Sequence, residues 1–232
     1  MTAPVKMEAL HHSSIVLPWQ GMERLRASCL GIVLVEIDAL VRDEKGLLTP
    51  READRAEKLG SRRRALFLGA RLALKALARR LGAAGKDTAD SVIETLGPDG
   101  VRPCLGESGL YCSVSHTDRL VVAVGHPQPV GVDIEAVSSK SLRVWHLFMP
   151  SVSPELLSTS GMEPERAATR AWTIKEAAAK AFGLDLSEAI REVEIVRVGD
   201  QESAIRHRGK THSVKHAEGE GRVLSLITWG GF

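Results

Sequence analysis

The sequence contains 232 residues, of which 44% are hydrophobic and 26% are charged, and its formal net charge is +2. The length suffices for one large domain or two small ones, and the small net charge argues against a dedicated non-specific nucleic-acid binder. The cysteines, Cys29, Cys104 and Cys112, are odd in number and lack any CxxC spacing, which indicates neither a disulfide framework nor a zinc site. No apolar run has the length of a membrane-spanning helix or the form of a leader, so we expect a reducing, cytoplasmic environment.

The first part of the chain predicts one strand and two helices after an irregular arm over residues 1–25. The apolar run over residues 29–40 is typical of a buried strand. Thr49, Pro50 and Glu52 have the spacing of an N-cap, a first helical position and a capping box, so a helix is expected to begin there. A second helix is expected over about 61–81, where apolar residues recur at helical spacing.

The later part of the chain predicts five strands separated by helices and a charged segment. Alternating or continuous apolar runs bounded by turn residues identify the strands over 109–116, 119–126, 131–137, 192–199 and 222–229. Helical structure with breaks is expected over 138–167, followed by a helix over about 167–183. The charged segment 199–222 is expected to form a solvated surface with loops and one short strand.

The order of these elements repeats along the chain. Each half has a strand that ends in an acidic residue, then helices, then further strands. We therefore predict an α+β fold with two similar α/β subdomains related by a pseudo-two-fold axis. The predicted divisions are the arm over 1–25, an N-terminal subdomain over 26–120 and a C-terminal subdomain over 121–232. A junction of this kind is a favoured place for a ligand site.

Four polar residues in the second half form a candidate site for chemistry. On a strand, Asp133 and Glu135 lie on one face, roughly 6.6 Å apart. On a helix, Glu176 and Lys180 are i and i+4 neighbours. Hard oxygen ligands favour Mg²⁺ or Mn²⁺ over zinc, and a lysine beside such an ion can contact a phosphate oxygen. Two simpler interpretations remain open: the carboxylates at a strand end that reaches solvent, and an exposed helical ion pair.

These residues resemble the motifs of the 4′-phosphopantetheinyl transferases. Residues 131–135, GVDIE, match the family pattern G-[IV]-D-[IVL]-E, and residues 172–180, WTIKEAAAK, match [FW]-[ST]-x-K-E-[AS]-x-x-K. Asp133 of the first motif and Glu176 of the second are separated by 43 positions, similar to the family spacing. Upstream, residues 113–117, SVSHT, resemble a strand-ending S-x-S-H motif, and residues 63–71 resemble an R-x-x-F-x-x-x-R helix.

The resemblance implies a subclass and an activity. The GVDIE motif lies at mid-chain, after a first half that mimics the second, as in the long, monomeric surfactin-synthetase-activator (Sfp) type. That type transfers the 4′-phosphopantetheine arm of coenzyme A to a serine of an apo acyl or peptidyl carrier protein and releases 3′,5′-ADP. A bound Mg²⁺, or Mn²⁺, and a lysine would neutralise the departing phosphate. Carrier proteins are typically acidic, which suits the positive balance of this chain.

The resemblance also implies roles for individual residues. Asp133, Glu135 and Glu176 would hold the metal, and Asp133, Glu176 and Lys180 would be the catalytic residues. The role of Glu176 as acceptor of the serine proton stays open. The expected coenzyme A contacts are Lys180 and Lys175 at the phosphates, Ser115 and His116 at a strand end, Arg64 and Arg71 at the 3′-phosphate, and Arg102 and Pro103 beside the adenine.

Two departures and two rival functions accompany this interpretation. Val101 interrupts the family G-[KR]-P turn, and Val152 stands where an F-x-x-x-E pattern counted from Phe148 has its Glu. One rival is an inactive scaffold or regulatory protein on the transferase fold. The other is a nucleic-acid binder that uses the basic helix over residues 61–80, on which Arg64, Arg71 and Lys75 fall on one stripe.

Overall fold

The computed structural model describes residues 19–37, 46–149 and 161–229 as an α+β fold with two sheets. The first sheet is antiparallel, in the order β1-β3-β2. The elements of this half are, in chain order, β1 (Gly31–Glu36), α2 (Pro50–Glu57), α3 (Ser61–Arg80), a short 3₁₀ turn (Asp90–Val92), β2 (Tyr111–His116) and β3 (Leu120–His126). The Thr49 hydroxyl accepts from the Glu52 amide at the start of α2, and the Glu52 carboxylate accepts in return, so the predicted capping box is confirmed.

The second sheet has five antiparallel strands in the order β4-β8-β7-β6-β5. The elements of this half are, in chain order, β4 (Val130–Ala136), α4 (Ser139–Phe148), α6 (Pro164–Phe182), α7 (Leu186–Glu192), β5 (Val193–Arg197), β6 (Glu202–His207), β7 (Lys210–Gly219) and β8 (Arg222–Thr228). The expectation of loops with one short strand over 199–222 was wrong. This segment forms two strands, β6 and β7, which pair with each other. Phe148 ends α4, and Val152 lies outside the described residues.

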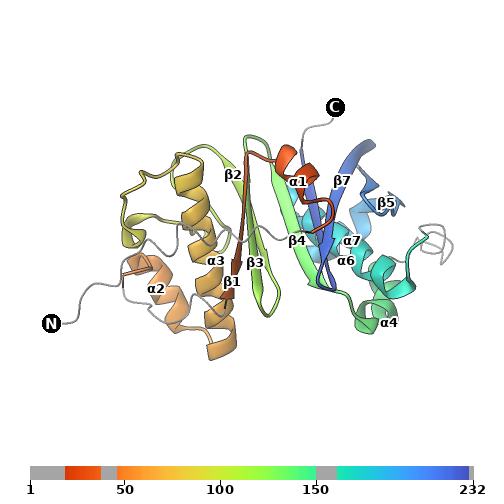
Figure 1. Ribbon diagram of the computed structural model, residues 1–232, viewed down its shortest axis with the longest axis horizontal. Coiled ribbons are helices and arrows are strands. Elements are labelled where there is room, and N and C mark those ends of the chain that lie inside the picture. The colour runs from red at the N-terminus through yellow and green to blue at the C-terminus, as the bar shows by residue number, and fades with distance from the viewer. Residues whose placement is uncertain (1–18, 38–45, 150–160, 230–232) are drawn as a thin grey trace.

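The two sheets face each other, and a long helix covers the outer face of each (Figure 1). Helix α3 packs on β1 and β3, whereas α6 packs on β4 and β8. A third apolar cluster lies between the sheets, where Val132 and Ile134 of β4 pack with residues of β1 and β3 such as Ile32 and Val122. Each half therefore has its own helix-on-sheet core, and a shared core joins the halves.

The two halves repeat one connectivity. In each half, the first strand pairs with the last strand, which in turn pairs with the strand before it: β1-β3-β2 and β4-β8-β7. The long helix that follows the first strand covers the sheet in both cases. This shared order is what a pseudo-two-fold requires. The pairing of β3 with β1 and β2 places residues 121–126 in the first half, so the sheets divide after His126 and not at residue 120.

The described part of the predicted N-terminal arm is ordered against the second half. Residues Met22–Ala27 form helix α1, and Trp19, Met22 and Leu25 are buried in the cluster between the sheets. Gln20 forms a bridge with Glu218 of β7. The expectation of an irregular arm was therefore wrong for these residues. In the described part of the chain no helix is long and apolar enough to span a membrane.

Candidate active site

Strand β4 presents the predicted acidic residues to helix α6. Successive residues of a strand face opposite sides, and because Val130, Val132 and Ile134 pack between the sheets, Asp133 and Glu135 face the other way. Helix α6 can lie close to this face because residue 131 is glycine. A Cβ at Gly131 would lie 1.9 Å from the carbonyl oxygen of Ala177, well inside van der Waals contact.

Asp133 is buried and paired with Lys180. The ammonium group of Lys180 donates to Asp133 Oδ1 at 2.8 Å and to the carbonyl oxygen of Val132 at 3.0 Å. Asp133 is only 4% exposed, so the interpretation of this carboxylate as a strand end in solvent was wrong. Lys180 therefore pairs across elements, from α6 to Asp133 of β4. This differs from the exposed Glu176–Lys180 pair within one helix that the sequence left open.

Glu135 and Glu176 are half-buried beside this pair. The pKa of Glu135 is raised to about 7, chiefly by burial and then by the negative charge of Asp133; a hydrogen bond from Trp172 opposes the shift, and Glu176 adds to it. The pKa of Glu176 is also raised, by burial, with Lys180 lowering it and Asp133 raising it. The three carboxylates therefore repel one another, and Lys180 only partly balances their charge.

The chemistry of these residues fits a hard divalent cation. Their donors are carboxylate oxygens, and Asp133 Oδ2 is buried with no hydrogen-bond partner in the described part of the chain. A cation at this oxygen would satisfy it and relieve the repulsion. In residues 19–37, 46–149 and 161–229, however, no three His, Cys, Asp or Glu side chains are grouped closely enough to hold a metal ion. The metal assignment of Asp133, Glu135 and Glu176 therefore stays a prediction.

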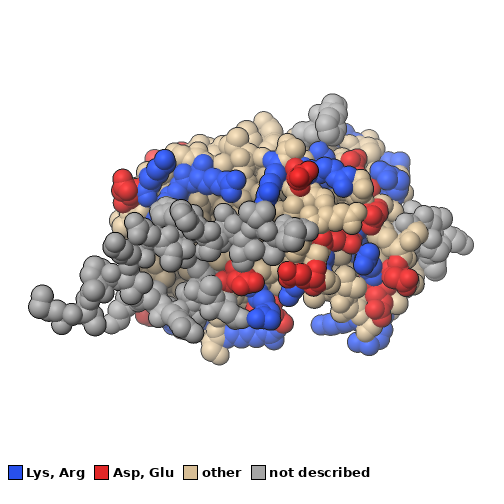
Figure 2. Space-filling view, in the orientation of Figure 1, with Lys and Arg blue, Asp and Glu red and all other residues tan. Residues whose placement is uncertain are grey.

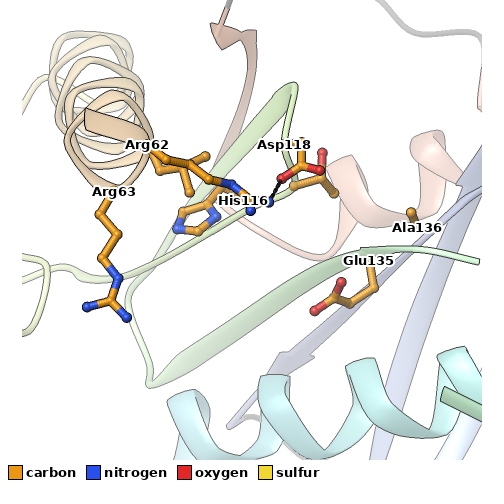
Figure 3. Close-up of a pocket in the computed structure, with 8 residues that line it drawn as sticks. Arg62, Arg63, His116, Asp118, Glu135 and Ala136 are labelled. Carbon is orange, nitrogen blue, oxygen red and sulfur yellow. Dashed lines mark hydrogen bonds and ion pairs between the residues drawn. The ribbon is translucent and has the colours of Figure 1, made fainter. Parts of the chain in front are cut away.

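A basic cavity of about 470 Å³ opens at Glu135. Figure 3 shows Arg62 and Arg63 on α3 and His116 at the end of β2, with Glu135 on β4 across the cavity. Arg62 also donates to Asp118 at 2.6 Å, although both side chains are largely exposed. The pKa of His116 is lowered, first by burial of the ring and then by Lys180. Arg62 and Arg63 can bind a phosphate group, and Asp118 and Glu135, which line the same cavity, offset part of their charge.

A larger, more apolar cavity of about 760 Å³ opens at Glu176 and Lys180. Arg102 and Pro103, predicted to lie beside an adenine, line it together with the exposed ring of Tyr111. One cavity is therefore lined by Glu135 and the other by Glu176. A ligand with phosphates and an apolar ring system has complementary surfaces in both.

Two predicted phosphate contacts, Arg71 and Lys175, are buried in the structure, as is Lys75 of the basic helix. Arg71 donates to the carbonyl oxygen of Thr95 at 2.6 Å and is 4% exposed, and Lys75 forms a fully buried ion pair with Glu52 at 2.6 Å. Lys175 donates to the carbonyl oxygens of α7, those of Ala189 and Ile190, and to that of Val193. Burial lowers its pKa to about 8. As described, these cations support the cores and are not open to a substrate phosphate.

Ser115 and Arg64 complete the set of predicted contacts. The Ser115 hydroxyl is buried and donates to Asp133 Oδ1 at 2.7 Å. It therefore supports the carboxylate, whereas the sequence predicted a contact with a coenzyme A phosphate. Arg64 is half-buried on α3. Sequence reasoning did not select Arg62, Arg63 and Trp172. Both arginines lie in the first turn of α3, which contains no acidic residue. This local excess of positive charge is the sequence signal that could have selected them as candidate anion contacts.

The comparisons with known proteins agree with this geometry. Residues 129–226, which include β4, α6 and most of β8, match the model of the 4′-phosphopantetheinyl transferase superfamily. Over these residues the chain resembles the 4′-phosphopantetheinyl transferase superfamily. It is 30% identical over 151 residues to enterobactin synthase component D of Salmonella typhi and 31% identical over 150 residues to that of Salmonella austin. Each alignment covers 64% of this chain.

The chain spans about three fifths of the length of these curated relatives, 61% and 60% respectively. The superfamily match confirms the family resemblance predicted from the motifs, and the α+β fold confirms the fold class predicted from the order of the elements. The superfamily region contains Asp133, Glu135, Glu176 and Lys180, whereas the basic cavity and Ser115 draw on residues that precede it.

Proposed function

We propose that this protein transfers the 4′-phosphopantetheine arm of coenzyme A to a serine of an apo carrier protein and releases 3′,5′-ADP. The observation that carries the proposal is the ion pair of the buried Asp133 with Lys180, flanked by Glu135, which lines one cavity, and Glu176, which lines the other. The superfamily match and the enterobactin synthase relatives support the same chemistry. The long, two-halved Sfp type fits the repeated connectivity of the sheets.

In this proposal, different groups of residues bind different parts of coenzyme A. In this proposal Arg62, Arg63 and His116 bind a phosphate in the basic cavity, and Arg102 and Pro103 contact the adenosine end in the larger one. Asp133 Oδ2, Glu135 and Glu176 would hold Mg²⁺, which supplies charge neutralisation at the pyrophosphate.

Lys180 can contribute to the transfer itself because it lines the larger cavity. It is held by Asp133 but keeps donor capacity, since an ammonium group has three protons. The serine oxygen forms a bond to the phosphorus that bears the pantetheine arm, and the bond from that phosphorus to the 3′,5′-ADP oxygen breaks. Lys180 stabilises the charge on the departing phosphate, and Glu176, which lines the same cavity, accepts the serine proton.

The partner class follows from charge and assembly. We propose an acidic carrier domain, a monomeric enzyme whose two halves form one site, and a cytoplasmic location. Figure 2 shows basic and acidic residues interspersed on one face, so on that face a carrier would meet local basic patches and not a uniform field. The nucleic-acid alternative loses part of its basis, because Arg71 and Lys75 of the basic helix are buried.

The proposal is tested by incubating the protein with coenzyme A, Mg²⁺ and apo fatty-acid, polyketide or peptide carrier domains, then measuring their intact masses. We expect a phosphopantetheine mass increase on at least one carrier, lost after chelation and restored by Mg²⁺. Asp133→Ala should lower the rate by about 10²–10³-fold, whereas Glu194→Ala, an exposed carboxylate on β5, should not change it. No mass increase on any carrier with folded protein would support the scaffold alternative instead.

A further inference from the structure

Strands β2 and β4 meet where the two sheets adjoin. Each is the edge strand of its own sheet, β2 of the first and β4 of the second. In the antiparallel pair of β4 with β8, alternate amides of β4 point away from its partner strand. An edge strand whose amides are buried must satisfy them elsewhere. The amides concerned here are those of Val132 and Ile134.

Two serine hydroxyls of β2 satisfy these amides. The amide of Val132 donates to Ser113 Oγ at 3.1 Å, and the amide of Ile134 donates to Ser115 Oγ at 3.4 Å. Both serines are buried. Because they are two residues apart on one strand, they project to the same side and match alternate amides of β4. The serine side chains thus take the place that carbonyl groups have in an ordinary ladder.

The two serines differ in one respect. A hydroxyl has one proton to donate, and Ser115 donates it to Asp133 Oδ1 at 2.7 Å. Ser113 has no such contact with Asp133. Since Lys180 donates to the same oxygen at 2.8 Å, Oδ1 is held from two sides. Oδ2 is buried and has no partner in the described residues, so it is the oxygen left for a cation.

We propose that Ser115 is a positioning residue, which orients Asp133 so that Oδ2 serves as the metal ligand. This inference rests on the proposed function, since it assigns Asp133 to a metal. Ser115 acts through Asp133 and does not bind a coenzyme A phosphate. Partners that orient a metal-ligating side chain commonly contribute 10- to 100-fold to metal affinity. Ser113, which fulfils the same structural duty toward β4 without contacting Asp133, serves as the matched control.

The test measures Mn²⁺ binding to metal-free protein by electron paramagnetic resonance, together with thermal unfolding, for Ser115→Ala and Ser113→Ala. Each variant leaves one buried amide without its acceptor, and Ser115→Ala also removes a donor to the buried Asp133, so we expect both melting temperatures to fall, that of Ser115→Ala at least as far. The dissociation constant for Mn²⁺ should rise at least about 10-fold in Ser115→Ala and stay within about twofold in Ser113→Ala. Ser115→Thr, which retains a hydroxyl, should recover most of the affinity. In the transfer assay, Ser115→Ala should need more Mg²⁺, and excess Mg²⁺ should restore most of its maximal rate.

Three results would count against the inference, and they separate it from the proposed function. Unchanged Mn²⁺ binding in Ser115→Ala, with a wild-type protein that binds Mn²⁺ and modifies a carrier, overturns the inference alone. Equal losses of affinity in both serine variants show a structural effect without specific orientation of Asp133. Failure of the wild-type protein to bind Mn²⁺ and to modify any carrier overturns the proposed function as well.

Discussion

A substitution at Gly131 tests how closely helix α6 must approach β4. In Gly131→Ala, the added Cβ would lie 1.9 Å from the carbonyl oxygen of Ala177 and 2.6 Å from the amide nitrogen of Ala181. Carbon–oxygen contacts below about 3 Å are repulsive, so α6 and β4 must separate locally by about 1 Å. Overpacking of this kind costs about 1–3 kcal/mol of stability.

The same displacement should impair transfer more than it impairs folding. It would lengthen the 2.8 Å contact between Lys180 and Asp133 beyond hydrogen-bond distance. A misplacement of about 1 Å can cost about 10²-fold in rate. Urea unfolding and the intact-mass transfer assay measure the two effects. Gly60→Ala is the control, because an added Cβ there meets no atom within 4 Å. Wild-type stability and rate in Gly131→Ala would refute the claim that this contact sets the distance.

Two further predictions concern buried charge. Glu52→Ala leaves the fully buried Lys75 without its carboxylate and should cost about 3–5 kcal/mol in urea unfolding, whereas Arg62→Ala, which removes an exposed pair, should cost less than about 1 kcal/mol. Equal effects would contradict the burial argument. Burial lowers the pKa of His216 well below 6.5, so the unfolded state binds the extra proton first and stability should fall as pH drops below 6.5. His216→Asn should reduce that slope by up to about 1.4 kcal/mol per pH unit, and an unchanged slope would show that His216 is protonated in the fold.

The placement of the acidic residues and Lys180 near one another was predictable because their motifs are local. The alternation that places Asp133 and Glu135 together, and the helical spacing of Glu176 and Lys180, depend on neighbours along the chain. The burial of Lys75 and Lys175 was not predictable in this way. Helical spacing shows which residues share a face, but not whether that face meets solvent, carbonyl groups or a buried carboxylate.

Two errors in the fold have similar causes. In β7 the buried alternation runs through His212, Val214 and His216, and counting histidine as polar concealed the strand pattern. Helix α1 begins after Gly21, which has a positive φ and no capping side chain, so its start lacks the usual signal. The mutual position of Arg62, Ser115 and Asp133 depends on how two sheets pack, which no spacing along one segment records.

The hydroxyl bridge between β2 and β4 makes the orientation of Asp133 sensitive to the position of one half relative to the other. The 2.7 Å contact between Ser115 and Asp133 spans the boundary between the sheets, and a relative shift of about 1 Å would break it while leaving both helix-on-sheet cores intact. The segment over 129–226 contains the carboxylates but not the strand that orients Asp133. With Ser115 in the proposed role, the competent unit is the pair of halves, and the proposed chemistry requires rigidity at their shared core.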